Sequence, residues 1–305
     1  MIEYSSSYYH MGRQEVFPGS AFSLKGSRIF SLSYHSIEIH RDMTQFSDRY
    51  EILKPLGRGG TAWVFLARDR KLKKYWAVKI LEKKGPGEKS REAAGRAMHE
   101  ARILSRLDLP GAVRIADLIE DGGKLCIVTD YIEGQDLKTY IYRYGRLSEK
   151  QAAAWLLELC GTLSRLHGMR PPVIFCDLKP ENIMVKTDGT LVLVDFGSAW
   201  QNEYAVCGEK IPRTGTYGYA APELYKEGGL PDPRTDIYGL GALGAFLLTG
   251  LHPGRICTSK AREKRELYGF GKIGRVIRRC METEPEKRYG SCEILKEILQ
   301  RIAEE

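Results

Sequence analysis

The feature that most constrains the fold of this chain is a pair of short segments in its middle. Residues 174–184 read Ile-Phe-Cys-Asp-Leu-Lys-Pro-Glu-Asn-Ile-Met, and residues 192–197 read Val-Leu-Val-Asp-Phe-Gly. Both place charged or amide side chains among apolar residues. Because a short motif occurs by chance in many unrelated chains, the weight of these two segments depends on the motifs that precede and follow them.

A glycine-rich segment lies in the first half of the chain. Residues 56–64 read Leu-Gly-Arg-Gly-Gly-Thr-Ala-Trp-Val and lie between two strand-like runs. Glycine lets the backbone approach phosphate groups closely and donate N–H groups to them. Taken alone, such a hairpin is more often a simple turn.

A lysine lies inside the apolar run that follows, at residues 75–80. Lys79 needs a partner of opposite charge if this strand is buried. The next predicted helix, at about residues 90–107, offers Glu100, and an ion pair would fix the ammonium group. Taken singly, Lys79 is more often a surface residue, and Glu100 one of several carboxylates on a solvated helix face.

Together, these motifs resemble those of the eukaryotic-type protein kinase superfamily. Residues 174–184 resemble its catalytic loop and residues 192–197 its Asp-Phe-Gly motif, and the glycine-rich segment and the lysine strand precede them in the family's order. Residues 215–223 resemble its substrate-binding loop and Ala-Pro-Glu motif, and residues 236–241 the start of its central helix. The resemblance covers about residues 48–300, and its wording is closest to bacterial serine/threonine kinases.

The resemblance implies an α+β fold with two lobes. Residues 47–132 would form a small antiparallel β lobe with one helix, and residues 133–305 a larger, mainly α lobe. The hinge between them is expected within residues 124–133, where an apolar strand runs into a turn. In the second lobe, apolar periodicity predicts a helix that follows Ser148 as its N-cap. Residues 1–46 are a Ser- and Tyr-rich N-terminal extension whose role the sequence does not reveal.

The resemblance also implies the catalytic residues and the cofactors, Mg-ATP with Mn²⁺ as an alternative metal. The implied catalytic residues are Lys79, Glu100, Asp177, Lys179 and Thr216, and the implied metal ligands are Asn182 and Asp195. Asp177 would orient the acceptor hydroxyl and accept its proton, Lys179 would reach the γ-phosphate, and Thr216 would bond to both. Arg288 stands where the family's late arginine pairs with Glu223.

The nucleotide-binding positions implied by the resemblance lie on the facing sides of the two lobes. They are Leu56, Gly57, Gly59, Gly60, Val64, Ala77, Lys79, Asp130, Ile132, Asp136 and Met184. Thr129 would be a small residue at the back of the adenine pocket. Each apolar member is equally well explained as ordinary core, and Asp136 as the cap of the next helix.

Three positions depart from the family pattern. Ala62 replaces the third glycine of the loop, and the His-Arg-Asp triplet reads Phe175, Cys176 and Asp177, a loop of the non-RD type. The missing arginine commonly grips a phosphate on the activation segment. We therefore expect activity that does not strictly depend on phosphorylation at Thr214 or elsewhere in that segment, with control by the extension or a regulatory partner. Cys176 is expected to be an inert thiol.

The predicted function is transfer of the γ-phosphate to Ser or Thr of a protein substrate, because Lys179 follows the serine/threonine form of the loop. One alternative is a pseudokinase scaffold that binds nucleotide with little transfer activity, and another is a small-molecule phosphotransferase. The formal charge of +8 is spread along the chain, and no recognition motif accompanies it, so no nucleic-acid partner is expected. The seven scattered cysteines and the lack of a membrane span or signal peptide predict a cytoplasmic protein with reduced thiols.

Overall fold

The computed structural model describes residues 47–58, 62–82, 88–201, 215–258 and 267–304. All of them belong to one compact unit, Met43–Glu305. Several sequence predictions lie outside the described residues: the extension at 1–46, Gly59 and Gly60 of the glycine-rich loop, and Thr214.

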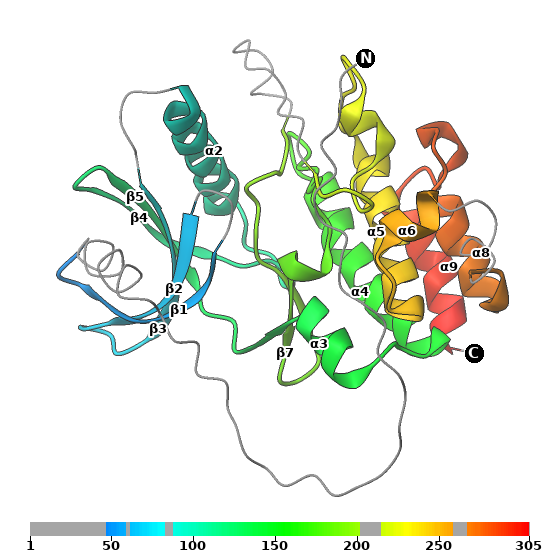
Figure 1. Ribbon diagram of the computed structural model, residues 1–305, viewed down its shortest axis with the longest axis horizontal. Coiled ribbons are helices and arrows are strands. Elements are labelled where there is room, and N and C mark those ends of the chain that lie inside the picture. Colours follow the sequence, from blue (N-terminus) through cyan, green and yellow to red (C-terminus); the bar gives the residue numbers. More distant parts are fainter. Residues whose placement is uncertain (1–46, 59–61, 83–87, 202–214, 259–266, 305) are drawn as a thin grey trace, which may run out of the picture. The chain divides into compact units, whose positions relative to one another are not determined.

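A five-stranded antiparallel sheet and one helix form the first lobe (Figure 1). The strands are β1 (Tyr50–Arg58), β2 (Ala62–Asp69), β3 (Tyr75–Glu82), β4 (Ile115–Asp121) and β5 (Lys124–Asp130), and the helix is α2 (Glu88–Ser105). The strand order is β1-β2-β3-β5-β4, so the strand after the helix returns to the edge and β5 pairs with β3. This arrangement confirms the predicted small β lobe with one helix.

The two faces of this sheet bury different residues. Side chains alternate along a strand, so Trp76, Val78 and Ile80 of β3 enter one apolar cluster while Lys79 and Leu81 point to the other face. Helix α2 packs on that second face, where Leu81 joins its apolar residues. The period of the strand thus directs Lys79 toward α2.

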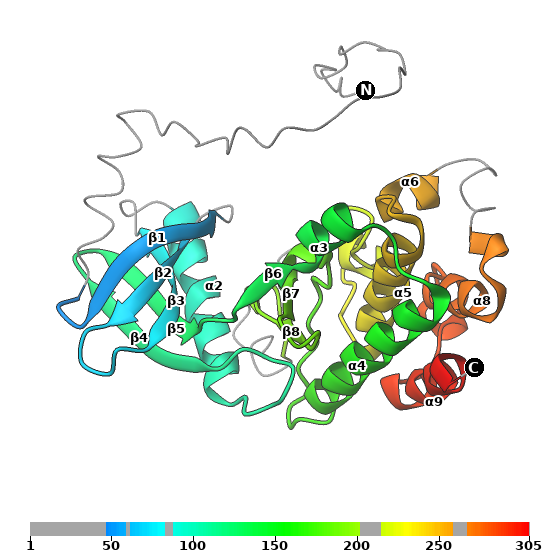
Figure 2. The same cartoon turned by 90° about the horizontal axis from the view of Figure 1, so that it is seen from below.

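The second lobe is mainly helical, as predicted (Figure 2). Its helices are α3 (Leu137–Tyr144), α4 (Glu149–His167), α5 (Pro233–Thr249), α6 (Pro253–Thr258), α8 (Gly271–Cys280) and α9 (Cys292–Glu304). A small sheet of β6 (Gly134–Asp136), β7 (Ile183–Lys186) and β8 (Leu191–Leu193) lies beside α3. Four short 3-10 helices complete the described chain: Pro180–Asn182, Pro222–Tyr225, Leu267–Gly269 and Pro285–Lys287.

Helix α5 is the buried centre of this lobe. Its residues from Thr235 to Leu248 are all buried, which is the pattern of a helix covered on every side. Asp232 and Thr235 form a capping box at its start, and Gly250 ends it with a left-handed backbone at φ 70°. Because the capping box satisfies backbone N–H groups of the first turn, it fixes the residue at which this very apolar helix begins.

The predicted helix boundaries agree closely with the structure. Ser148 caps α4 by accepting a hydrogen bond from the Gln151 N–H at 3.2 Å, as expected. Helix α2 ends at Ser105, before the predicted end, because Arg106 and Leu107 bond three residues back in a tightened final turn. Within the described ranges, no helix is long and apolar enough to cross a membrane.

Candidate active site

Helix α5 anchors the backbone of the loop that carries Asp177, through the side chain of Asp236. Asp236 is fully buried, and its carboxylate accepts the backbone N–H groups of Phe175 and Cys176, each at 2.8 Å. The same carboxylate bonds to His167 at the end of α4, also at 2.8 Å. The sequence motifs place Asp236 only at the start of a helix, and they do not single out His167. Their contact fixes the backbone that presents Asp177.

Asp177 lies at the centre of a hydrogen-bond network. Lys179 Nζ lies 2.7 Å from its Oδ2 and 2.8 Å from Thr216 Oγ1. Thr216 donates to Asp177 Oδ1 from its hydroxyl at 2.9 Å and from its N–H at 3.1 Å. Asn182 Nδ2 donates to the carbonyl and to Oδ2 of Asp177. Four of the predicted residues therefore meet at one point: three come from the same loop, and Thr216 comes from a segment 39 residues away.

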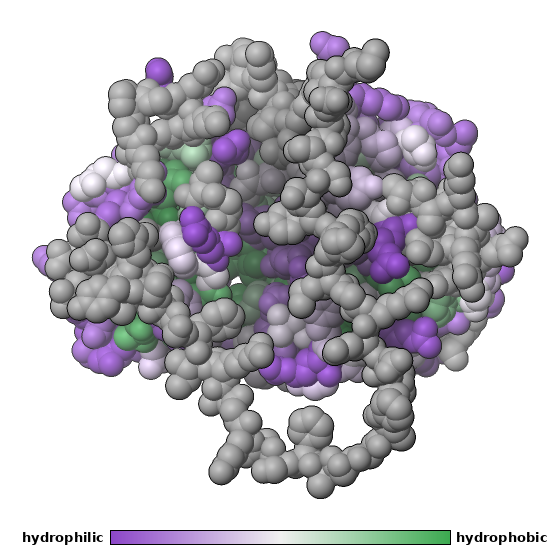
Figure 3. Space-filling model, viewed as in Figure 1, coloured by the Kyte–Doolittle hydropathy of each residue, from purple (hydrophilic) through white to green (hydrophobic). Residues whose placement is uncertain are grey.

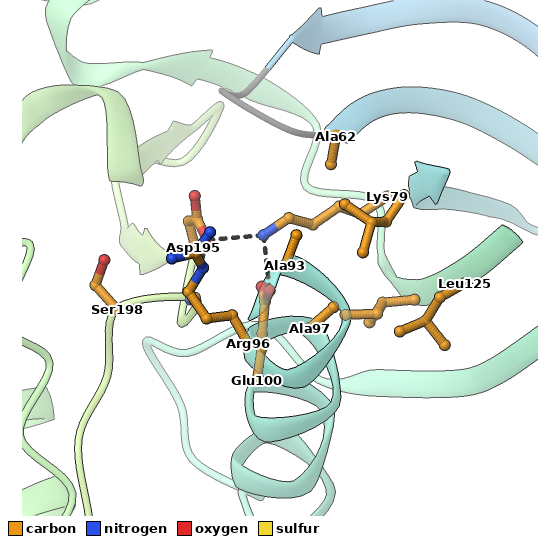
Figure 4. A pocket seen from close by; sticks show the side chains of 12 residues that line it. Ala62, Lys79, Ala93, Arg96, Ala97, Glu100, Leu125, Asp195 and Ser198 are labelled. Atoms are coloured by element: carbon orange, nitrogen blue, oxygen red, sulfur yellow. Dashed lines mark hydrogen bonds and ion pairs between the residues drawn. The ribbon is translucent and has the colours of Figure 1, made fainter. Parts of the chain in front are cut away.

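A second group of charges joins the two lobes (Figure 4). Lys79 Nζ lies 2.7 Å from Glu100 Oε2 and 3.0 Å from Asp195 Oδ1. Burial alone would lower the pKa of Lys79, but the two carboxylates outweigh it and raise it. Burial alone would raise the pKa of Asp195, but Lys79 holds it below its usual value. Lys79 is thus a fixed cation and Asp195 a fixed anion.

The donor set fits a hard cation such as Mg²⁺. Asn182 uses its amide nitrogen toward Asp177, and its Oδ1 has no hydrogen-bond partner among the described residues. The side chain of Asp195 is about half exposed despite its bond to Lys79, so it has oxygen available. Amide and carboxylate oxygens are the ligands that Mg²⁺ prefers. Next to them, a Cβ on Gly197 would lie 3.1 Å from Asp195 Oδ1, which favours glycine there.

The predicted nucleotide positions that the structure describes lie on strands of the first lobe, on the segment that follows β5 and on the small sheet of β6 and β7. In the sheet, Val64 pairs with Lys79, Gly57 with Val64, and Ala77 with Thr129. The other described members are Leu56, Asp130, Ile132, Asp136 and Met184, of which Asp136 and Met184 pair across β6 and β7. Figure 3 shows hydrophobic residues in the middle of this face, between the lobes.

Two acidic residues of the hinge region have structural partners that the sequence did not fully predict. Asp130 bonds to Lys74 at 3.2 Å and to Arg114 at 2.8 Å, so its side chain ties the end of β5 to two other segments of the first lobe. Asp136 caps α3, because its two oxygens accept the N–H and the hydroxyl of Thr139. The cap was one of the two interpretations of Asp136, and its contact with the nucleotide stays a prediction.

Cys176 occupies an apolar site with a strained backbone. Its φ is 64°, which is uncommon for a residue other than glycine. The side chain is buried in a cluster with Ile174, Ala220 and Leu224, and Trp200 packs against it. Burial raises the pKa of this thiol well above its usual value, and the nearby carboxylates add to the effect. Burial and a raised pKa both disfavour the reactive thiolate, which supports the expectation of an inert thiol.

A cavity of about 150 Å³ lies between α2 and the sheet, behind the Lys79–Glu100 pair. Figure 4 shows Arg96 and Ser198 among the residues that line it, together with the small side chains of Ala93 and Ala97. This cavity adjoins the candidate site and was not predicted from the sequence.

Comparison with known proteins shows the family of this chain. The family model described as "Protein kinase domain" matches residues 50–301. Sperm motility kinase 3A of Mus musculus is 30% identical over 229 residues, which are 75% of this chain and 43% of that protein. Serine/threonine-protein kinase tousled-like 1 of Homo sapiens is 33% identical over 228 residues, which are 70% of this chain and 30% of that protein. The chain spans less than half the length of these two curated relatives.

Solved structures agree at the level of the fold. The PknI kinase domain of Mycobacterium tuberculosis superimposes with a TM-score of 0.67 at 23% identity, covering 86% of this chain and 98% of that one. At this identity the likeness shows the two-lobed fold alone.

Proposed function

The chain belongs to the protein kinase family, and from that premise we propose that it transfers the γ-phosphate of Mg-ATP to serine and threonine hydroxyls of protein substrates. The observation that carries this proposal is the convergence of Lys179, Thr216 and Asn182 on the carboxylate of Asp177. Phosphoryl transfer needs positioning and charge neutralisation more than covalent chemistry. A carboxylate held by three neighbours supplies the positioning.

The roles of the residues follow from their surroundings. When bound, Mg-ATP supplies the phosphoryl group and the metal charge that neutralises it. Asp177 would orient the acceptor hydroxyl and accept its proton at a carboxylate oxygen. Lys179, whose ammonium already bonds to Asp177 and Thr216, would offset negative charge near the acceptor. Asn182 and Asp195 would hold the metal.

The test is a transfer assay with the full chain. We expect radiolabel from γ-labelled ATP and Mg²⁺ to appear on Ser and Thr of a generic basic protein, with the positions mapped by mass spectrometry. Lys79→Met should lower the rate at least about a hundred-fold, because it removes the cation that Glu100 and Asp195 hold. Lys287→Met serves as the control, since the side chain of Lys287 is 64% exposed and forms an ion pair with the exposed Glu284.

Two results would count against the proposal, when the assay is accompanied by a nucleotide-binding measurement and by a test with small hydroxyl compounds as acceptors. Nucleotide binding without transfer in the unmodified chain would favour the scaffold reading, and transfer to a small hydroxyl compound but to no protein would favour a small-molecule phosphotransferase. A protein substrate is supported by residues 215–223, whose backbone turns at Gly215 and Gly218 and which present Thr216 to Asp177.

We further propose that activity does not require phosphorylation of the activation segment. The position that would hold a phosphate-binding arginine is Cys176, and its packing partners are apolar residues that include Ala220 and Leu224. This cluster ties the catalytic loop to the end of the segment without any charge.

Treatment with a phosphatase should therefore leave most of the activity, within about two-fold, because neutral packing is insensitive to phosphate. The measurement is transfer to the generic substrate before and after treatment, with mass spectrometry to verify removal. Inactive dephosphorylated protein that regains activity on phosphorylation at Thr214, or elsewhere between Asp195 and Glu223, would falsify this part of the proposal.

A further inference from the structure

Helix α8 presents basic side chains along one side of its surface. None of its residues is acidic, and four are basic: Lys272, Arg275, Arg278 and Arg279. The four basic positions fall on one side of the helix, because successive residues are about 100° apart around its axis. The opposite side is buried and apolar, with Ile273, Val276 and Ile277. Figures 1 and 2 both place α8 at the end of the second lobe away from the sheet of the first lobe.

The three arginines of α8 repel one another without a carboxylate to offset them. Arg275 lies three residues before Arg278 and four before Arg279, so the three side chains are neighbours on the helix surface. Like charges at these spacings destabilise a helix. Among the described residues, no acidic side chain forms an ion pair with any of the three arginines. We call Arg275, Arg278 and Arg279 the arginine face.

The carboxylates around this helix are placed or engaged elsewhere. Glu149 of α4 lies at the start of α8, where its Oε2 would be 3.5 Å from a Cβ on Gly271. After the end of α8, Glu284 pairs with Lys287 at 2.7 Å, and Glu286 pairs with Arg234 at 3.4 Å. Arginines in a last turn also balance the helix dipole, but this leaves Arg275 in the middle of α8 unexplained.

Two of the three guanidinium groups are held by aromatic rings. The guanidinium carbon of Arg278 lies 4.0 Å from the ring centroid of Tyr268, and its Nη1 donates to the carbonyl of Leu267 at 2.9 Å. The guanidinium carbon of Arg279 lies 4.5 Å from the ring centroid of Tyr289. A side chain that is already held loses less conformational freedom when a ligand binds. The arginine face is therefore ordered in advance for an anion.

The chemistry of this face favours an acidic protein segment as its partner. A guanidinium fork binds a carboxylate through two parallel hydrogen bonds. A helix that binds a membrane surface inserts its apolar side into the lipid, whereas the apolar side of α8 is buried in the core. Single-stranded nucleic acids stack their bases on aromatic rings, but Tyr268 already stacks on Arg278, and Tyr289 is buried.

We propose that the arginine face binds an Asp- and Glu-rich segment of a protein substrate, outside the stretch that carries the acceptor hydroxyl. The binding itself does not depend on phosphoryl transfer, whereas its use in capturing a substrate rests on the proposed kinase function. A substrate held at a second place has a higher effective concentration of its acceptor at the catalytic site.

The first test measures binding to the full chain without any transfer reaction. The probe is a short fluorescent peptide rich in Asp and Glu that lacks Ser, Thr and Tyr, and the readout is anisotropy. We expect Arg275→Glu/Arg279→Glu to weaken binding at least about ten-fold, because two attractive charges become repulsive. Arg275→Lys/Arg279→Lys should weaken it about five-fold, since lysine keeps the charge and loses the fork.

The matched control lies on α9 of the same lobe. Lys296→Glu/Arg301→Glu makes the same change of charge at two exposed positions, on a helix that also carries Glu293 and Glu297. This control should leave the affinity for the peptide within about two-fold. Thermal melting verifies that all variants are folded. An affinity that Arg275→Glu/Arg279→Glu leaves unchanged, or that the control lowers equally, would overturn the site.

The same binding measurement compares two other classes of anionic partner. One is vesicles that contain phosphatidylserine, and the other is a single-stranded oligonucleotide. We expect both to bind the full chain more weakly than the acidic peptide does. Tighter binding of either one, lost in Arg275→Glu/Arg279→Glu, would overturn the choice of a protein segment.

The second test asks whether the arginine face captures substrates. Two peptides with one serine differ only in an Asp- and Glu-rich tail, joined through flexible Gly-Ser linkers in a series of lengths. At the best length we expect the tail to lower KM about ten-fold with kcat unchanged. Arg275→Glu/Arg279→Glu should remove this advantage and leave the rate with the tailless peptide unchanged.

The outcomes of the two tests separate this inference from the proposed function. Binding of the acidic peptide without any KM advantage at any linker length would overturn the role in substrate capture and leave the kinase function standing. Absence of transfer to both peptides and to the generic protein would overturn the kinase function, while the binding result would still decide whether the arginine face holds an acidic segment.

Discussion

Asp177→Asn should lower the single-turnover rate of phosphoryl transfer about a thousand-fold, while the protein stays folded and still binds ATP. The amide keeps the shape of the carboxylate but cannot accept the proton of the acceptor hydroxyl. It also weakens the ion pair with Lys179 and the hydrogen bonds from Thr216. The measurement is the single-turnover rate with labelled ATP, together with nucleotide binding by calorimetry.

Asp188→Asn is the matched control for this variant. Asp188 lies in the turn between β7 and β8, its side chain is 58% exposed, and it bonds only to its neighbours Lys186 and Thr190 among the described residues. The control should retain the full rate. A rate for Asp177→Asn within ten-fold of the unmodified protein would mean that another group accepts the proton.

Arg288→Leu should destabilise the second lobe strongly, by about 3 to 5 kcal/mol, because it leaves a buried carboxylate without its partner. Both nitrogens of the Arg288 fork bond to Glu223 at 2.7 Å, and the guanidinium also donates to three backbone carbonyls. Both residues are buried. We expect a fall in Tm of roughly 10 °C by calorimetry.

The control for Arg288→Leu is a substitution of the preceding residue, Lys287. Lys287→Ala removes an exposed ion pair with Glu284, and such pairs contribute little, so its Tm should change by less than about 2 °C. Equal changes in Tm for Arg288→Leu and Lys287→Ala would contradict the argument that a buried ion pair stabilises the fold more than an exposed one.

The effect of Arg288→Leu should also depend on pH. Burial alone would raise the pKa of Glu223, but the hydrogen bonds from Arg288 outweigh it and hold it below its usual value. A carboxyl group with a lowered pKa stabilises the fold above its unfolded pKa and loses this contribution as the pH falls through the folded value. The difference between the two proteins should therefore shrink as the pH is lowered from 7 to below about 4.

The sequence predicted the two-lobed fold through the family resemblance, and local patterns predicted individual elements of it. The alternation in β3 directs Lys79 to one face, and Ser148 marks the start of α4. The motif order placed Asp177, Asn182 and Asp195 in one family site without any knowledge of distances. These features depend on neighbouring residues along the chain, so one sequence is enough to read them.

Only the tertiary structure decided which groups meet across long stretches of chain. Asp236 holds the loop of Asp177 from a helix far away in the sequence, and Lys138 reaches Glu181 from α3. The packing of Gly218 against Gly254, which sets the ring of Tyr217, is likewise invisible in a linear reading. Local patterns determine the direction of a side chain from its own element, whereas its partner depends on how separate elements pack. The sequence therefore determined the family and the candidate catalytic groups, and the fold decided which distant residues hold those groups in place.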